Sequence, residues 1–231
     1  MYLGEFTGKG VRIAVVDSGV FAAHPHVGGV AGGVGIRDDG SIHGDYVDEL
    51  GHGTAVTAAI REKAPDAEII AIKVFERVLK TDITTLVRGI DEAAARGADV
   101  INLSLGTARS QHRSLLENAV ARARTRGALI VSANDDGGVR WFPGCLEDVV
   151  AIRADWSCER GAYTIGFVED RLMLLTSAYP REIPGVPRER NLNGVSFAVA
   201  NATGFVACAL EGMDERSLVS VMATLKGRTT S

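Results

Sequence analysis

The chain has 231 residues, of which 46% are hydrophobic and 23% charged, and its formal net charge is −4. This length allows one sizeable core and is short for two full domains, so we predict a single domain over residues 1–231. The slightly acidic balance argues against a nucleic-acid partner. No apolar run approaches the roughly 20 residues that a membrane-spanning helix needs, so we expect no membrane contact.

The N-terminal stretch MYLGEFTGKG has no apolar core of the signal-peptide kind, so we expect neither a signal peptide nor a propeptide in this chain. The three cysteines, Cys145, Cys158 and Cys208, have no metal-ligand spacing and are odd in number, so we expect three free thiols. Free thiols are usual in the cytosol, and we therefore expect a cytoplasmic location. The alternative is a secreted mature form whose prepro-segment has been removed.

The predicted elements alternate between strands and helices. In chain order they are a strand at 11–16, a helix at 54–64, a strand at 67–75, a helix at 82–97, a strand at 99–105, a helix at 114–127, and strands at 128–133 and 148–152. Residues 157–190 have β-like pieces and three prolines, so we expect hairpins or loops there. A helical run after Ser196 and an amphipathic helix near 214–225 end the chain. This order predicts an α/β fold in three layers, with a mostly parallel twisted sheet and helices on both faces.

Three polar residues come at or just after the carboxyl ends of predicted strands. Asp17 follows the strand at 11–16, Ser104 lies at the end of the next-but-one strand, and Asn134 follows the strand at 128–133. Binding sites of open parallel sheets lie beyond the carboxyl ends of the strands, so these residues are expected at one edge.

Each candidate taken alone also has an ordinary structural explanation. Asp17 could be a turn or capping residue, and Asn134 could be a simple turn residue. His52 lies between two glycines, which makes a functional role about as probable as a structural one. Ser196 precedes a helical run, and on its own it is better explained as a helix cap.

Together the four residues supply every group that acyl transfer needs. A serine hydroxyl becomes a nucleophile when a histidine accepts its proton, and a buried carboxylate fixes the histidine tautomer. An asparagine amide can donate to the oxyanion that forms on the attacked carbonyl.

The motifs VVDSGV, GHGT and NGVSFA, in the order Asp, His, Ser, resemble the signature motifs of the subtilisin-like serine peptidases, the subtilases. SAND resembles the family's oxyanion segment, and DVINLSLG resembles the strand that lines its substrate cleft. The resemblance covers about residues 11–210.

This resemblance implies a site and a reaction. Asp17, His52 and Ser196 would form the catalytic triad, and Asn134 with the Ser196 N–H would form the oxyanion hole. The backbone of Ser104, Leu105 and Gly106 would pair with an extended peptide or protein substrate. The implied activity is that of a serine endopeptidase that needs no cofactor.

The chain departs from the family pattern around the nucleophile. Val195, Ala200 and Asn201 stand where the family has threonine, proline and histidine, and Ala55 replaces a histidine after the GHGT motif. The connection REKAPDAE is too short for the calcium loop of many subtilases, so we predict no metal there.

Two acidic residues after Asn134 bear on which peptide side chains the site would accept. Asp135 and Asp136 could favour a Lys or Arg side chain before the cleaved bond, although solvated turn carboxylates explain them as well. We predict a dedicated precursor-peptide processing protease. The alternatives are a catalytically silent peptide-binding relative in a peptide-maturation complex, a hydrolase of small acyl groups, and a nucleotide-binding domain, which the lack of a phosphate-binding glycine motif disfavours.

Overall fold

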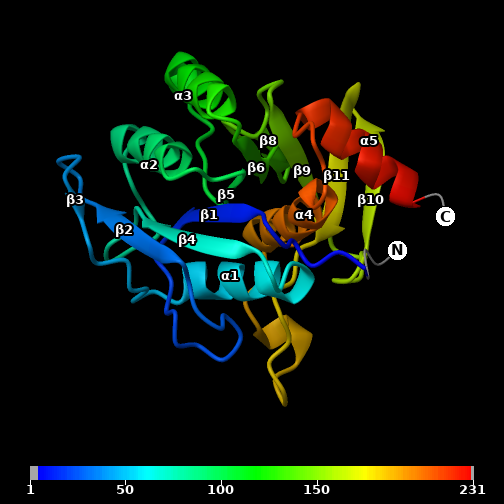
Figure 1. Ribbon diagram of the computed structural model, residues 1–231, viewed down its shortest axis with the longest axis horizontal. Helices are drawn as coiled ribbons and strands as arrows, with labels where there is room; N and C mark the ends of the chain where they lie inside the picture. The colour runs from blue at the N-terminus through cyan, green and yellow to red at the C-terminus, as the bar shows by residue number, and fades with distance from the viewer. Residues whose placement is uncertain (1–4, 230–231) are drawn as a thin grey trace.

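The computed structural model describes residues 5–229, and its centre is a nine-stranded sheet (Figure 1). The strand order is β10-β11-β9-β6-β5-β1-β4-β2-β3, and every pair is parallel except β2-β3 and β10-β11. The strands are β1 (Arg12–Asp17), β2 (Gly32–Ile36), β3 (Ile42–His43), β4 (Glu68–Lys73), β5 (Val100–Leu103), β6 (Leu129–Ala133), β9 (Val149–Asp155), β10 (Tyr163–Val168) and β11 (Arg171–Ser177).

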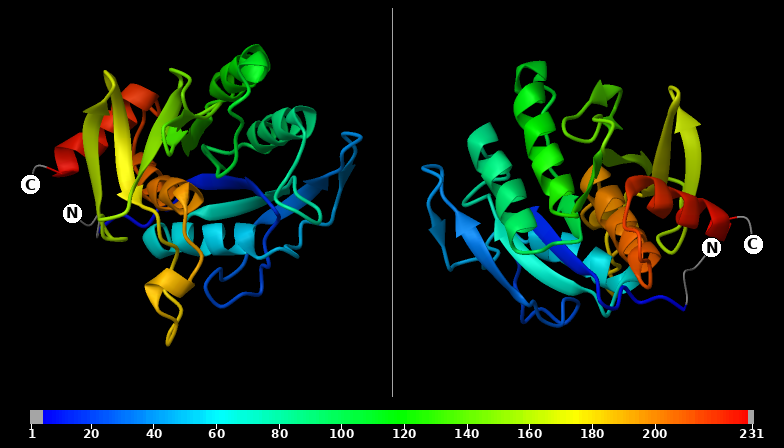
Figure 2. Two further views of the ribbon diagram at one scale, coloured as in Figure 1. Left: turned by 180° about the vertical axis from the view of Figure 1, so that it is seen from behind. Right: turned by 45° about the horizontal axis from the view of Figure 1, so that its top comes forward.

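Helices cover both faces of this sheet, and the predicted three-layer α/β fold is confirmed (Figure 2). The helices are α1 (His52–Lys63), α2 (Ile83–Ala95), α3 (Arg113–Thr125), α4 (Val195–Leu210) and α5 (Leu218–Thr229). Successive side chains of a strand point to opposite faces, which splits the core in two. Ile13 and Val15 of β1 pack with α1, α4 and α5, whereas Ala14 and Val16 pack with α2 and α3.

Two parts of the chain hold structure that the sequence did not predict. Residues 18–51 contain β2 and β3, which extend the sheet beyond β4. A small separate hairpin, β7 (Asp135–Asp136) with β8 (Val139–Arg140), follows β6. Glycine-rich segments such as Gly32–Ile36 lack the apolar alternation that marks a strand, and pairing with β4 supplies what periodicity does not.

The C-terminal third contains the expected hairpin, but the last helix begins later than predicted. β10 and β11 pair in antiparallel fashion, and β11 pairs in parallel with β9. The last helix begins at Leu218 rather than near 214, because the Ser217 side chain accepts a hydrogen bond from the Ser220 N–H at 3.1 Å.

The carboxyl end of β1 lies at the switch point of the sheet. From β1 the chain passes through β2, β3 and α1 to β4 on one side of β1, and from β4 through α2 to β5 on the other side. Ligands of open α/β sheets bind where the chain direction divides in this way. Asp17, the last residue of β1, therefore stands where a site is expected.

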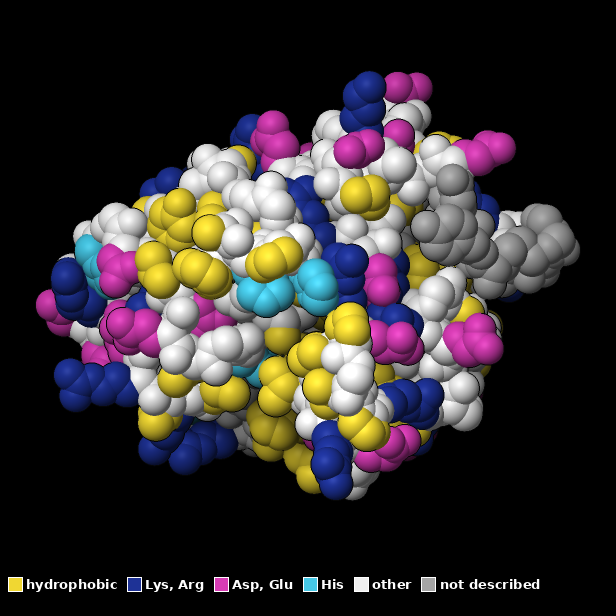
Figure 3. Space-filling view, turned by 90° about the horizontal axis from the view of Figure 1, so that it is seen from below, with side chains coloured by type: hydrophobic (Ala, Val, Ile, Leu, Met, Phe, Trp, Pro, Cys, Tyr) yellow, Lys and Arg dark blue, Asp and Glu magenta, His cyan; other side chains and the backbone are white. Residues whose placement is uncertain are grey.

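Other expectations concern the surface and the thiols. Among residues 5–229 no helix is long and apolar enough to cross a membrane. Basic and acidic side chains are interspersed on the face below α1 (Figure 3). All three cysteines are free thiols, as predicted.

Candidate active site

Asp17 and His52 form a close hydrogen-bonded pair. His52 Nδ1 lies 2.7 Å from Asp17 Oδ1, and Asp17 is fully buried. The same oxygen accepts the Ser18 N–H at 2.7 Å, while Asp17 Oδ2 is buried without a partner in the described part of the chain. A buried carboxylate on Nδ1 fixes the imidazole so that Nε2 is free to take up a proton.

Two glycines allow α1 to begin at His52, against the end of β1. Gly51 has φ 82°, a left-handed conformation that favours glycine. A Cβ on Gly53 would lie 2.1 Å from the Gly19 carbonyl oxygen and 3.2 Å from Asp17 Cβ. The GHG sequence is therefore required for the close approach that brings His52 to Asp17.

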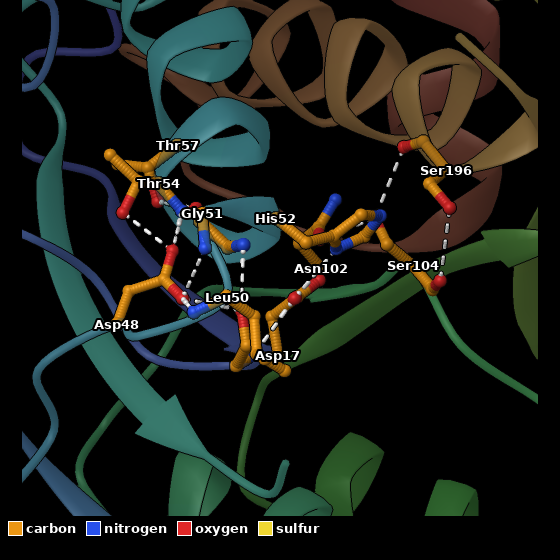
Figure 4. A network of polar contacts seen from close by, with 12 residues as sticks. Asp17, Asp48, Leu50, Gly51, His52, Thr54, Thr57, Asn102, Ser104 and Ser196 are labelled. Carbon is orange, nitrogen blue, oxygen red and sulfur yellow. Dashed lines mark hydrogen bonds and ion pairs between the residues drawn. The ribbon is translucent and has the colours of Figure 1, made fainter. Parts of the chain in front are cut away.

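Asp48, which sequence reasoning missed, holds the start of α1 in place (Figure 4). Its Oδ1 accepts from Ser18 Oγ at 2.8 Å and from the N–H groups of Leu50 and Gly51, each at 2.9 Å. Its Oδ2 accepts from the Thr54 N–H at 2.9 Å and from Thr54 Oγ1 at 2.6 Å. Gly51 has no side chain to cap the helix, so the carboxylate three residues earlier takes that role.

The pKa of His52 is raised by its surroundings. Burial acts to lower it, but the hydrogen bond that His52 donates to Asp17 and the negative charges of Asp17 and Asp48 outweigh burial. The imidazolium is thus stabilised, which is what a base needs when it takes a proton from a neighbouring hydroxyl.

Ser196 is not a helix cap. α4 begins at Val195 with Gly194 as the capping position, and Ser196 makes no capping bond. Instead its Oγ donates to the Ser104 carbonyl oxygen at 3.4 Å, and Ser104 Oγ donates to the Ser196 carbonyl oxygen at 3.1 Å. The capping interpretation, preferred when the segment is taken alone, is wrong, and this exchange ties the start of α4 to the end of β5.

His52 and Ser196 line one cavity of about 630 Å³ at the carboxyl edge of the sheet. The predicted substrate-binding residues Ser104, Leu105 and Gly106 line it too. Gly106 approaches Phe142 closely, since a Cβ there would lie 2.5 Å from the Phe142 carbonyl oxygen. The next residue, Thr107, forms an antiparallel bridge with Phe142, which fixes this wall of the cavity.

Asn134 and Asp135 lie beside this cavity and not in its lining. The Asn134 side chain is 2% exposed, its Nδ2 donates to Asp135 Oδ1 at 3.2 Å, and its Oδ1 accepts from Arg171 Nη1 at 3.2 Å. Asp136, in contrast, lines the cavity. The structure therefore joins Asp17 to His52 and places His52 and Ser196 in the lining of one cavity, whereas the Ser196 hydroxyl is bonded to Ser104 and the Asn134 amide is engaged outside the lining.

The departures around the nucleophile have distinct structural consequences. α4 runs unbroken from Val195 to Leu210, as expected with alanine at position 200. Asn201 Nδ2 donates to the carbonyl oxygens of Ser177 at 2.9 Å and Tyr179 at 3.0 Å, which ties α4 to the segment after β11. Val195 lines the cavity directly before Ser196.

The connection between α1 and β4 is as short as the sequence indicates, because α1 ends at Lys63 and β4 begins at Glu68. Within residues 5–229 no three His, Cys, Asp or Glu side chains are grouped to hold a metal ion. The absence of calcium stays a prediction.

Comparisons with known proteins identify the family. The model of the subtilase family matches residues 8–158, which include Asp17, His52 and Asn134 and end before Ser196. The chain therefore belongs to the subtilase family.

Similarity to individual proteins extends over the rest of the chain. This chain is 29% identical over 238 residues to subtilisin Savinase of Lederbergia lenta, and the match covers 97% of this chain and 85% of that one. It is 36% identical over 160 residues to the minor extracellular protease Epr of Bacillus subtilis, covering 64% of this chain. An alkaline protease of Alkalihalobacillus alcalophilus is 29% identical over 97% of this chain.

The chain spans 24% of the length of the Epr protease and 60% of the alkaline protease. Among solved structures, a cold-adapted subtilisin-like serine proteinase matches with a TM-score of 0.74 and 21% identity, covering 96% of this chain and 83% of that one. This likeness shows the subtilisin-like fold.

Proposed function

We propose that the chain is a serine endopeptidase in which Ser196 is the nucleophile, His52 the general base and Asp17 the carboxylate that orients His52. The observation that carries this proposal is the 2.7 Å bond between Asp17 and His52 beside a cavity that Ser196 also lines. Family membership supports the same activity.

The proposed reaction proceeds in two stages. The Ser196 hydroxyl first turns from the Ser104 carbonyl oxygen toward His52. Ser196 Oγ then attacks the substrate carbonyl carbon while His52 Nε2 accepts the hydroxyl proton. The tetrahedral intermediate collapses, His52 returns the proton to the leaving amine, and an acyl-enzyme remains. Water then attacks the ester with His52 again as base, which releases the second product and restores the Ser196 hydroxyl.

The oxyanion of the intermediate requires N–H donors. Ser196 lies in the first turn of α4, where N–H groups are free of helical partners and the helix dipole is positive. We assign the second donor to Asn134 Nδ2, which must leave Asp135 Oδ1 and turn toward the cavity when substrate binds. Ser104, Leu105 and Gly106 would pair with the substrate backbone, and Asp136 would favour Lys or Arg before the cleaved bond.

Cleavage assays test this proposal. Internally quenched peptides with mixed sequences should be cleaved by the protein and left intact by Ser196→Ala. Mass spectrometry of the products gives the cleavage sites, and a profile without preference for Lys or Arg would remove the role of Asp136. Cleavage confined to one sequence would support a dedicated role in processing a precursor peptide.

A second candidate function is a peptide-binding relative with little or no turnover. The observation that favours it is the Asn134 amide, which is held by Asp135 and Arg171 outside the cavity lining. Such a protein would bind extended peptides with equal affinity before and after Ser196→Ala and would release them uncleaved.

A further inference from the structure

The cavity extends from Ser196 to an end that the proposed chemistry does not use. Asp136 and Trp141 line it near the end of β6, whereas Leu79, Lys80 and Thr81 line it in the loop between β4 and α2. In the sheet, β6 and β4 lie on opposite sides of β5 and β1. The loop between β4 and α2 is therefore the far wall of the cavity, which we call the distal end.

Two basic side chains that line the cavity have no partners in the described part of the chain, and one of them, Lys80, lies at the distal end. Lys80 comes from the loop, and Arg109 comes from the segment after β5. Neither forms an ion pair or a side-chain hydrogen bond within residues 5–229, whereas most arginines of the protein do. Their positive charge is thus available to a bound molecule.

Asp82, the acidic residue that follows Lys80 most closely in the sequence, is already engaged in other bonds. Asp82 Oδ1 accepts from the N–H groups of Thr84 at 2.7 Å and Thr85 at 2.9 Å, and its Oδ2 accepts from Thr85 Oγ1 at 2.9 Å. The carboxylate is the cap of α2, and the positive end of the helix offsets its charge. It leaves Lys80 and Arg109 without an acidic partner.

We propose, on the basis of the proposed function, that the cavity binds a carboxylate of the substrate through Lys80 at the distal end and Arg109 in the same lining. The substrate class is a peptide with an Asp or Glu side chain at one position away from the cleaved bond. An extended peptide paired with Ser104, Leu105 and Gly106 would run along the cavity that Ser196 and the distal end both line, because these residues follow β5, which lies between β6 and β4 in the sheet.

The expected preference for Glu over Gln is modest, because the Lys80 and Arg109 side chains are exposed to solvent. Both residues are largely exposed, and exposed charge pairs contribute modestly. We expect kcat/KM for a Glu peptide to exceed that for the Gln peptide by about fivefold at low salt. The ratio should fall toward one in 0.5 M salt, because the screening length shortens to a few ångströms.

A positional scan tests the proposal. Internally quenched peptides, blocked at both termini, carry Glu, Gln or Lys at each of eight positions around the cleaved bond. The wild-type protein should prefer Glu over Gln over Lys at one position. The double variant Lys80→Glu/Arg109→Glu should reverse that order at the same position, and the matched control Arg126→Glu, on an exposed residue outside the cavity, should leave it unchanged.

Two further measurements distinguish failure of the carboxylate site from failure of the proposed peptidase activity. Binding of the same peptides to Ser196→Ala, measured by fluorescence anisotropy, should show the same Glu preference without any cleavage. Equal binding and equal cleavage of Glu and Gln peptides at every position would overturn the carboxylate site while leaving the peptidase intact. Preference for Glu in binding with no cleavage of any peptide would overturn the peptidase and keep the site. Matched peptides with a free C-terminus form the last comparison, and a preference seen only with them would overturn the proposal that a side-chain carboxylate is bound.

Discussion

Substitution of Asp48 tests how the base is held in place. Asp48→Ala removes an acceptor of five hydrogen bonds that join Ser18, next to Asp17, to the first turn of α1. Loss of a helix cap costs about 0.5–2 kcal/mol. The remaining donors are partly solvated, so we expect about 2–3 kcal/mol in all for the free energy of unfolding.

That loss should appear in both stability and catalysis. For a domain of this size about 2–3 kcal/mol lowers Tm by about 4–12 °C, measured by calorimetry. Because Asp48 also contributes to raising the pKa of His52, the acid limb of kcat/KM should move to lower pH. Asp48→Asn keeps an acceptor and removes the charge, so it should show the pH shift with a smaller loss of Tm.

Glu49→Ala is the matched control, because Glu49 is an exposed acid in the same loop. It should change neither Tm nor the pH profile. If Asp48→Ala behaves like Glu49→Ala in both assays, Asp48 does not position His52 and the reasoning is refuted.

Three further predictions concern the site and its support. Because the pKa of His52 is raised and its neutral form is the base, kcat/KM should rise with pH through an apparent pKa above that of ordinary histidine. Asp17→Asn should lower this apparent pKa and reduce kcat about 10³–10⁴-fold. Asn134→Ala should lower kcat about 100-fold at unchanged KM in steady-state assays, and an unchanged kcat would exclude an oxyanion role. Asn201→Ala should cost about 2 kcal/mol in a urea titration, because two buried carbonyl groups lose their donor; a loss below about 0.5 kcal/mol would contradict this.

The parts of the fold that the sequence predicts are those with strong local patterns. The buried strand that ends at Asp17 is a continuous apolar run, and the helices after it have regular apolar spacing and clear stops, so their order alone predicts the parallel sheet. β2 was not predicted, because Gly32–Ile36 carries little side-chain pattern and depends on β4 for its pairing.

In the site, too, residues in short motifs could be predicted, whereas contacts between distant parts of the chain could not. Asp17, His52 and Ser196 are carried by short motifs, and the fold brings them together. The position of the Asn134 amide depends on Arg171, 37 residues away, which no local pattern indicates. Asp48 had a usable signal, because it is an acidic residue three positions before the glycine at the capping position of α1, but its contact with Ser18 is visible only in three dimensions.

The most direct test of the proposed activity is covalent labelling of Ser196. A fluorophosphonate probe should add one phosphonyl group to the protein, and peptide mapping by mass spectrometry should place it on Ser196. Ser196→Ala should take up no label, and His52→Ala should react far more slowly because the hydroxyl has lost its base. A correctly folded wild-type protein that stays unlabelled, or carries the label on another residue, would contradict the account.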